Sequence, residues 1–187
     1  MGGAAAPPSR RNTGCVPGRE LCRPPRERGP RAMSQYEEII DGRTLVRSFP
    51  GARHERICAL LHQRVGAGLA GNAAARLLSP RGAVALSART VVRPDLALVT
   101  AATEKVWLVV EIIDSADHHP DTVLKKGIYE DFKVPRVWMV DPRYDNVEIY
   151  HATPHGLALR GILAGREVLE EGLLPRLAMT VADLFAV

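Results

Sequence analysis

The pattern of apolar and polar positions along the chain predicts a mixed α/β domain. Residues 36–47 form two short strand-like runs around Asp41-Gly42, a two-residue turn that favours a β-hairpin. An amphipathic helix is predicted next, from His54 to about Leu69, with Cys58 on or beside its buried face. The apolar positions that define this face recur at helical spacing: Ile57, Leu60, Leu61, Val65 and Leu69.

The apolar runs that follow predict two neighbouring strands joined by a short turn. Residues 83–99 are strand-like but are broken by Arg93-Pro94, and proline is tolerated at the start of a strand. Asp95 is therefore expected where the second part of this run begins. Residues 106–113 are apolar except for Glu111, a composition typical of a central strand that is covered on both faces.

A second helix is predicted from His119 to about Lys133, because Pro120 suits a first helical position. At about 100° per residue, Lys125 falls within the buried sector of this helix. The apolar stripe of that sector is expected at Leu124, Ile128 and Phe132. Further strands are predicted at residues 137–140 and 147–150, with shorter strands from Gly156 and a last turn of helix at 181–185.

One glycine-rich segment, Gly66-Ala-Gly68-Leu-Ala-Gly71, matches the GxGxxG pattern of dinucleotide-binding proteins. The pattern binds a pyrophosphate when it follows a strand and opens a helix. Here it is expected at the end of a helix. The segment is therefore interpreted as a helix C-terminus and loop, and no nucleotide cofactor is predicted.

Residues 1–32 differ in composition from the rest of the chain. They hold five Gly, six Pro, seven Arg and two acids, a net charge of +5, so the rest carries −1 of the total of +4. Too few large apolar residues are present to offset the entropy of ordering, so a disordered basic tail is predicted. It could be a DNA-binding arm, a targeting peptide, or sequence upstream of a true start at Met33. Residues 33–187 are predicted to form the folded domain.

Charge, hydropathy and cysteine content restrict the remaining possibilities. Because the predicted domain is close to neutral, its charge alone gives no argument for phosphate binding. No segment approaches the roughly 18 apolar residues of a membrane span, so no membrane partner is expected. Cys15, Cys22 and Cys58 are too few and too scattered for a disulfide framework. A cytoplasmic protein is expected.

The acid within the predicted central strand is the first candidate for chemistry. A buried carboxylate such as Glu111 is costly unless an ion pair, neutralisation or a metal compensates its charge. A hairpin would bring Asp95 beside it, and two converging carboxylates repel each other unless a cation lies between them. Asp95, Glu111 and the backbone carbonyl of Ile112 are therefore predicted to hold Mg²⁺, with Mn²⁺ as a substitute.

A lysine that faces inward adds a third ionisable group. Beside two carboxylates, Lys125 could position a nucleophilic water or stabilise charge on a phosphate. The alternative is a structural ion pair between Lys125 and Glu111. The spacing of these residues in the sequence does not distinguish the two roles.

The same residues belong to a longer ordered pattern. Its segments are Arg93-Pro94-Asp95, Val110-Glu111-Ile112, Asp121-x-x-x-Lys125-x-x-x-Tyr129 and Val134-Pro-Arg-Val-Trp138-Met-Val-Asp141-Pro142. This set resembles the Uma-two family of restriction-endonuclease-like proteins, within the PD-(D/E)XK nuclease superfamily. The Glu38-Ile-Ile-Asp41-Gly42 hairpin and His54 are similar to the N-terminal pattern of that family. The resemblance covers nearly all of residues 36–187.

The resemblance implies a restriction-endonuclease-like fold, with a central mixed β-sheet flanked by helices and an N-terminal β-hairpin. It also implies roles for five residues: Asp95 and Glu111 as magnesium ligands, Lys125 as the catalytic lysine, and Glu38 and His54 as accessory site residues. The superfamily often places its lysine two residues after the second acid. Position 113 is Ile in this sequence, so Lys125 would take that role from the helix.

The function expected from these features is Mg²⁺-dependent endonucleolytic hydrolysis of DNA phosphodiester bonds. A homodimer, or a separate partner that recognises the DNA, is compatible with that function. Two alternatives stay open at this point. The fold could be a catalytically silent module that binds nucleic acid or a protein, or it could hydrolyse another phosphate ester, because fold alone does not determine function.

Overall fold

The structure is a computed structural model, which describes residues 1–2, 35–113 and 120–187. The compact unit Met33–Val187 contains every helix and strand named below. Nearly all of the predicted tail and the predicted helix start at His119 lie outside the described residues.

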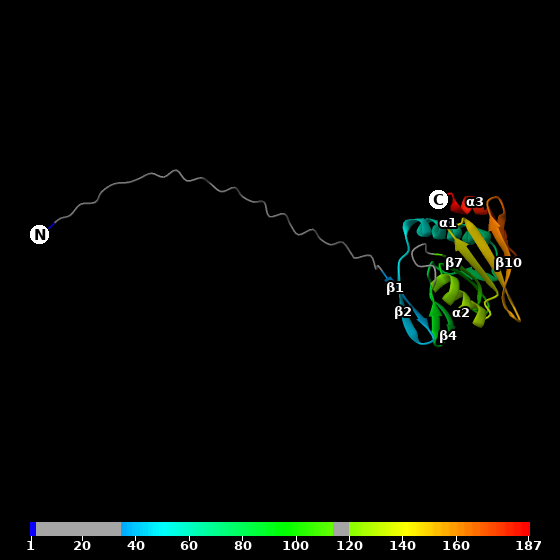
Figure 1. The fold of residues 1–187 in the computed structure, drawn as a ribbon, viewed down its shortest axis with the longest axis horizontal. Helices are drawn as coiled ribbons and strands as arrows, with labels where there is room; N and C mark the ends of the chain where they lie inside the picture. The colour runs from blue at the N-terminus through cyan, green and yellow to red at the C-terminus, as the bar shows by residue number, and fades with distance from the viewer. Residues whose placement is uncertain (3–34, 114–119) are drawn as a thin grey trace. The chain divides into compact units, whose positions relative to one another are not determined.

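Six strands form the central sheet, in the spatial order β10-β9-β8-β7-β6-β3 (Figure 1). They are β3 (Ala75–Leu77), β6 (Leu96–Thr100), β7 (Val106–Ile112), β8 (Arg136–Asp141), β9 (Asn146–Thr153) and β10 (Gly156–Ala164). Among these described strands, β7 and β8 pair in parallel and the other neighbours pair antiparallel. The predicted mixed α/β fold with a mixed central sheet is confirmed. The short strand β3 was not predicted.

A second sheet carries the N-terminal hairpin, in the order β2-β1-β5-β4. Its strands are β1 (Gln35–Ile40), β2 (Arg43–Ser48), β4 (Val84–Ser87) and β5 (Thr90–Val92). Asp41 and Gly42 both have positive φ, 49° and 78°, as a tight two-residue hairpin turn requires. The predicted hairpin is confirmed. The predicted run 83–99 contains one break more than expected, because a turn separates β4 from β5.

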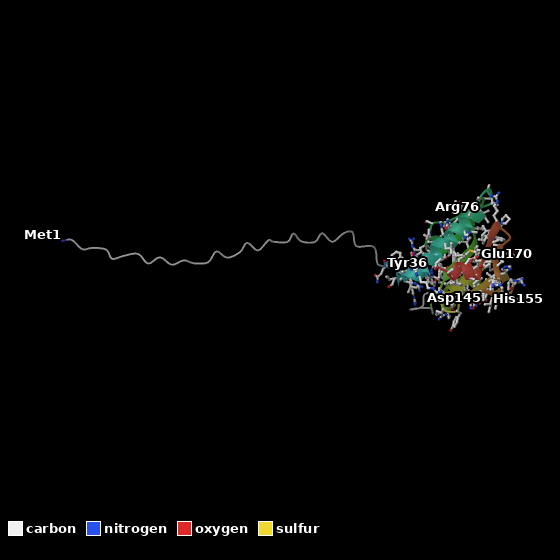
Figure 2. The ribbon with its side chains drawn as sticks, turned by 90° about the horizontal axis from the view of Figure 1, so that it is seen from above. Met1, Tyr36, Arg76, Asp145, His155 and Glu170 are labelled. Atoms are coloured by element: carbon white, nitrogen blue, oxygen red, sulfur yellow. The ribbon has the colours of Figure 1, made fainter. Side chains whose placement is uncertain are left out.

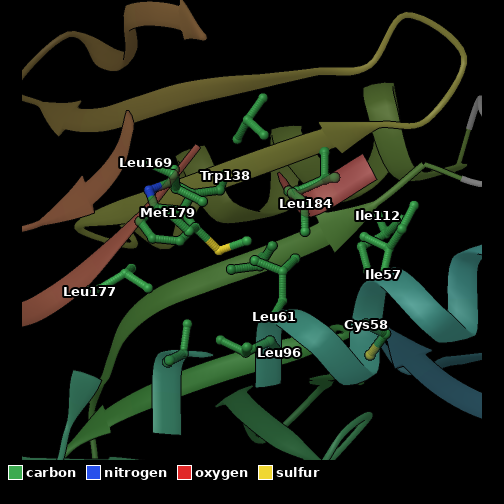
Figure 3. Packing of buried hydrophobic residues seen from close by; sticks show 14 of the residues in the cluster. Ile57, Cys58, Leu61, Leu96, Ile112, Trp138, Leu169, Leu177, Met179 and Leu184 are labelled. Atoms are coloured by element: carbon green, nitrogen blue, oxygen red, sulfur yellow. The ribbon is translucent and has the colours of Figure 1, made fainter. Parts of the chain in front are cut away.

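One face of the central sheet is covered by α1 (Ala52–Gly68). Figure 3 shows Ile57, Cys58 and Leu61 of this helix packed towards Leu96 and Ile112 of the sheet. The helix predicted from His54 to Leu69 is thus confirmed, with its apolar stripe inward. The same core is closed by elements from the C-terminal part of the chain: β11 (Val168–Glu171), β12 (Leu174–Thr180) and α3 (Val181–Phe185).

The opposite face is covered by η1, a π-helix (Pro120–Lys125), and by α2 (Lys126–Asp131). Ile128 and Tyr129 of α2 pack in a second core with Val109 of β7 and Met139 of β8. Side chains alternate between the two faces of a strand. Val109 and Glu111 therefore point to the face that α2 covers, whereas Leu108, Val110 and Ile112 point towards α1.

The predicted apolar stripe of the second helix is wrong at two of its three positions. Leu124 and Phe132 are 39% and 40% exposed, and Ile128 alone of the three is buried. A π-helix places its hydrogen bonds five residues apart, so residues 120–125 do not follow the angle of an ordinary α-helix. Phe132 lies beyond the last residue of α2. Lys125, which was predicted to face inward, is 1% exposed.

The glycine-rich segment lies where it was predicted, with Gly68 as the last residue of α1. A Cβ at Gly68 would stand 3.2 Å from Cβ of Leu177, so the helix end packs closely on β12. No helix in the described part of the chain is long and apolar enough to cross a membrane. Charged side chains such as Arg76, Asp145 and Glu170 lie exposed around the domain (Figure 2).

Candidate active site

The β6–β7 hairpin brings the two predicted acids together. Leu96 pairs with Val110 in the antiparallel ladder, so Asp95 lies opposite Glu111 one position further along. Asp95 is 5% exposed and Glu111 is 1% exposed. Two carboxylates are therefore buried at the same end of the central sheet, on the strand positions that the sequence indicated.

Glu111 receives two hydrogen bonds from the helix that covers its face. Nζ of Lys125 donates to Oε2 of Glu111 over 3.1 Å, and the hydroxyl of Tyr129 donates to Oε1. Residues four apart lie on the same side of a helix, which is how Lys125 and Tyr129 reach one carboxylate. The ion pair between Lys125 and Glu111 that the sequence left open is present in this structure.

Glu38 approaches the same lysine from the N-terminal sheet. Its Oε1 lies 3.1 Å from Nζ of Lys125 and accepts a hydrogen bond of 2.7 Å from the backbone N–H of Arg93. Its Oε2 is buried and has no hydrogen-bond partner among the described residues. Lys125 therefore lies between two buried carboxyl groups that come from different sheets.

Asp95 is held by groups from three different elements. The backbone N–H of Ile112 donates to Oδ2 over 2.9 Å, and Nε2 of His54 lies 3.2 Å from the same oxygen. Nη2 of Arg81 lies 3.4 Å from Oδ1. Burial acts to raise the pKa of Asp95, but the hydrogen bond and charge of His54, followed by the charge of Lys125, hold it below its ordinary value.

His54 lies in the first turn of α1, and its ring is buried. Besides its contact with Asp95, its Nε2 lies 2.9 Å from the backbone carbonyl oxygen of Ile112. Its Nδ1 is buried and has no hydrogen-bond partner among the described residues. Burial acts to lower the pKa of His54, but the neighbouring carboxylate of Asp95 raises it above its ordinary value.

The five predicted site residues thus lie in one region, around the end of the β6–β7 hairpin. Comparison with known proteins then identifies the family. Residues 25–182 match the Uma2 family, which is described as a putative restriction endonuclease. The chain belongs to the Uma2 family. This is the Uma-two family to which the sequence pattern pointed.

A solved structure agrees with this family at the level of the fold. The chain is similar to the crystal structure of a putative nuclease from Anabaena variabilis, with a TM-score of 0.66 and 13% identity. The similarity covers 80% of this chain and 89% of that one. At this identity it concerns the fold alone. No protein with a curated description matches the sequence.

Two residues that contact the predicted acids, Tyr129 and Arg81, were given no role by the sequence analysis. Tyr129 stands in the sequence pattern quoted above, and its position four residues after Lys125 could have indicated that both side chains reach Glu111. Arg81 lies in the loop before β4, where no periodicity marks it, and its guanidinium lies 5.5 Å from the ring of Phe49. Phe49 also contacts Tyr36, with 5.5 Å between ring centroids. Burial raises the pKa of Tyr36, opposed by the positive charge of Lys125.

The donor atoms at this site fit a hard divalent cation. Carboxylate and carbonyl oxygens, such as those of Asp95, Glu111 and Ile112, are the ligands that Mg²⁺ prefers. The buried, unpartnered Oε2 of Glu38 is a further oxygen nearby. Within residues 35–113 and 120–187, however, no three His, Cys, Asp or Glu side chains are grouped closely enough to hold a metal. In this arrangement Lys125 and Arg81 compensate the carboxylates, and His54 contacts Asp95.

Proposed function

We propose that this Uma2 protein is a Mg²⁺-dependent endonuclease that hydrolyses DNA phosphodiester bonds. The observation that carries the proposal is the position of Lys125, buried between Glu38 and Glu111, and of Asp95 opposite Glu111. Buried ionisable side chains that cluster in this way mark a candidate functional site. The family description supports the same class of reaction.

Each residue has a role in this proposal. Asp95, Glu111 and the carbonyl of Ile112 would hold Mg²⁺, which when bound supplies a Lewis acid for the attacking water and the leaving oxygen. Lys125 stabilises the negative charge that develops on the phosphate and orients the water. Glu38 and Tyr129 position Lys125 and Glu111 through the contacts described above.

The test is cleavage of supercoiled plasmid and of single-stranded DNA by the full chain, with Mg²⁺, with Mn²⁺ and with a chelator. Glu111→Gln and Lys125→Met should each abolish metal-dependent cutting, because one removes a metal ligand and the other removes the cation next to the phosphate. Glu148→Gln is a matched control, since Glu148 lies two strands from Glu111 in the central sheet and accepts a hydrogen bond from Tyr150. Cutting that survives in Glu111→Gln would contradict the assignment.

One observation favours a second function, a nuclease-fold module that binds nucleic acid or a protein without catalysis. The acids are buried, and internal cations already compensate them. Metal binding distinguishes the two functions. A nuclease site gains thermal stability from Mg²⁺ or Mn²⁺ because the ligand binds the folded state, whereas a closed ion-pair cluster gains none.

A further inference from the structure

An exposed aromatic ring lies beside the candidate active site. Phe49 lies between β2 and α1 and is 43% exposed. Its ring contacts that of Tyr36, with 5.5 Å between the centroids and 58° between the ring planes. The guanidinium carbon of Arg81 lies 5.5 Å from the centroid of the Phe49 ring. These three side chains, the Phe49 cluster, hold one ring in place and leave part of it open to solvent.

Both neighbours of Phe49 connect it to the predicted site residues. Nη2 of Arg81 lies 3.4 Å from Oδ1 of Asp95, so one guanidinium contacts both the aromatic ring and the acid. Tyr36 lies two residues before Glu38 on β1, and residues two apart point to the same face of a strand. A nucleotide whose phosphate lies at the acids would therefore hold its base close to the ring of Phe49.

The charge of the domain favours stacking over phosphate attraction as the source of affinity here. Residues 33–187 carry a formal charge of −1, and the cations of the site already have partners. Lys125 pairs with Glu38 and Glu111, and Arg81 pairs with Asp95. Binding to the backbone of a DNA duplex requires Lys and Arg side chains that neutralise several phosphates. Stacking of a base on an aromatic ring requires no net positive charge, and only unpaired bases offer it a free face.

We infer that Phe49 stacks on an unpaired base of single-stranded DNA, beside the phosphate that lies at the acids. The inference rests on the proposed function in taking DNA as the substrate, and it names the form of that DNA. Tyr36 supports the ring, and Arg81 adds a cation next to it. The bases of an intact duplex are stacked on one another and offer Phe49 no face. The substrate is therefore a single strand, or a duplex in which a base beside the cut is unpaired.

The chain offers a matched control for Phe49. Phe132 is 40% exposed, but it lines a groove together with Val106 at the start of β7, whereas Glu111 lies near the end of that strand. Phe132→Ala therefore removes an equally exposed ring away from the acids. At the site itself, Phe49→Leu keeps an apolar side chain without the flat ring, and Phe49→Tyr keeps the ring. The melting temperature of each variant shows whether it is folded.

The experiment is a titration of fluorescently labelled DNA with the full chain, followed by fluorescence anisotropy. A thymidine oligonucleotide is used as a single strand and paired with its complement, with chelator present to prevent metal-dependent cutting. Phe49→Ala and Phe49→Leu should lose about tenfold in affinity for the single strand, the usual effect of one lost stacking contact, and should bind the duplex as the wild type does. Phe49→Tyr and Phe132→Ala should keep the wild-type affinity for both.

The dependence on salt distinguishes stacking from charge. A ring neutralises no phosphate, so Phe49→Ala should lose the same factor in affinity at every salt concentration. The N-terminal arginines are unchanged in all variants and contribute equally to each. A single 2-aminopurine in the thymidine strand reports the contact directly, because its fluorescence falls when it stacks on an aromatic ring. The fall on binding should be present with the wild type and Phe132→Ala and absent with Phe49→Leu.

Three results would overturn the inference. One is unchanged single-strand affinity in Phe49→Ala, and another is an equal loss for the single strand and the duplex. The third is a change of oligomeric state in Phe49→Ala with unchanged DNA binding, which would assign the ring to an interface between copies of the chain. Single-strand binding that depends on Phe49 without metal-dependent cleavage would contradict the nuclease alone. Cleavage that is unaffected by the loss of the Phe49 ring would contradict the stacking contact alone.

Discussion

Nζ of Lys125 lies 3.1 Å from Oε1 of Glu38, and both side chains are buried. Glu38 belongs to β1 of the N-terminal sheet, whereas Lys125 ends the π-helix that covers the central sheet. The contact therefore joins the N-terminal sheet to the helical segment that covers the central sheet. Because Lys125 also pairs with Glu111, a single cation offsets two carboxylates that come from different sheets.

Replacing this lysine should destabilise the fold. Lys125→Met leaves the carboxylates of Glu38 and Glu111 buried without their shared cation, and breaking a buried pair in this way typically costs about 3–5 kcal/mol. Urea unfolding of the full chain measures the loss. Lys126→Met is the control, because Lys126 is partly buried and bonds to Tyr150 instead. Equal losses for the two variants would contradict the role given to Lys125.

The two acids should also show coupling to this lysine. Glu38→Gln removes one buried negative charge, so in the Lys125→Met background it should recover part of the lost stability. In the wild-type background the same change removes an ion-pair partner and should destabilise. This change of sign, measured by a double-mutant cycle, is expected only if the residues interact directly.

The stability of the metal-free protein should depend on pH through His54 and Asp95. The pKa of His54 is raised above 6.5 by Asp95, so its contribution is complete below pH 6.5 and is lost as pH rises through the folded pKa. The pKa of Asp95 is lowered below 3.8, so its contribution is complete above pH 3.8 and is lost as pH falls through the folded pKa. The contact between His54 and Asp95 therefore adds most to the stability of the folded protein between pH 3.8 and pH 6.5.

Thermal unfolding with chelator, at pH values from about 5 to 9, tests the histidine part of this prediction. The melting temperature of the wild type should fall relative to that of His54→Gln as the pH rises past 6.5. Parallel curves for the two proteins would show that the protonated ring adds no stability.

Two glycines near the end of α1 should respond in opposite directions to alanine. A Cβ at Gly66 would stand 3.6 Å from Leu77, an ordinary contact, so Gly66→Ala should stabilise by about 0.5–1 kcal/mol through helix propensity. A Cβ at Gly68 would stand 3.2 Å from Leu177, so Gly68→Ala should destabilise by about 1 kcal/mol or more through overpacking. Chemical denaturation of both variants measures the difference, and two stabilised variants would contradict the close packing on β12.

Cys58 should be unreactive in the folded protein. Burial raises its pKa to about 12, and its thiol donates to the carbonyl oxygen of Asp95 over 3.6 Å. In a Cys15→Ser, Cys22→Ser background, a maleimide should label this thiol only as fast as the chain unfolds. Denaturant provides the control, since it should expose the thiol fully. Rapid labelling under native conditions would show that α1 opens locally.

Local signals in the sequence were enough to predict the elements that carry most of the site. The Asp41-Gly42 turn, the apolar stripe of α1 and the buried strand around Glu111 each depend on residues close together in the chain. The register between β6 and β7 then follows from the hairpin, which is why Asp95 was expected beside Glu111.

Other features depend on contacts that no local pattern encodes. Leu124 lies in the π-helix and is exposed, although an α-helical period predicts that it is buried. Arg81 reaches Asp95 from a loop, and the backbone N–H of Arg93 reaches Glu38 from the residue that follows the neighbouring strand β5. The sequence also did not distinguish compensation of the acids by internal cations from compensation by a metal, because both arrangements use the same residues.

The parallel pairing of β7 with β8 has a consequence for the order in which the protein can be made. Parallel neighbours cannot be joined by a tight turn. The strand β7, which carries Glu111, therefore gains its parallel neighbour only after β8 has been synthesised. Lys125, in the connection between these strands, is placed only when that crossover closes. A nascent chain that has just completed the β6–β7 hairpin therefore exposes its two carboxylates without their lysine. The contacts of Lys125 with Glu38 and Glu111 are thus completed late in translation, after Asp141 at the end of β8 has been added to the chain.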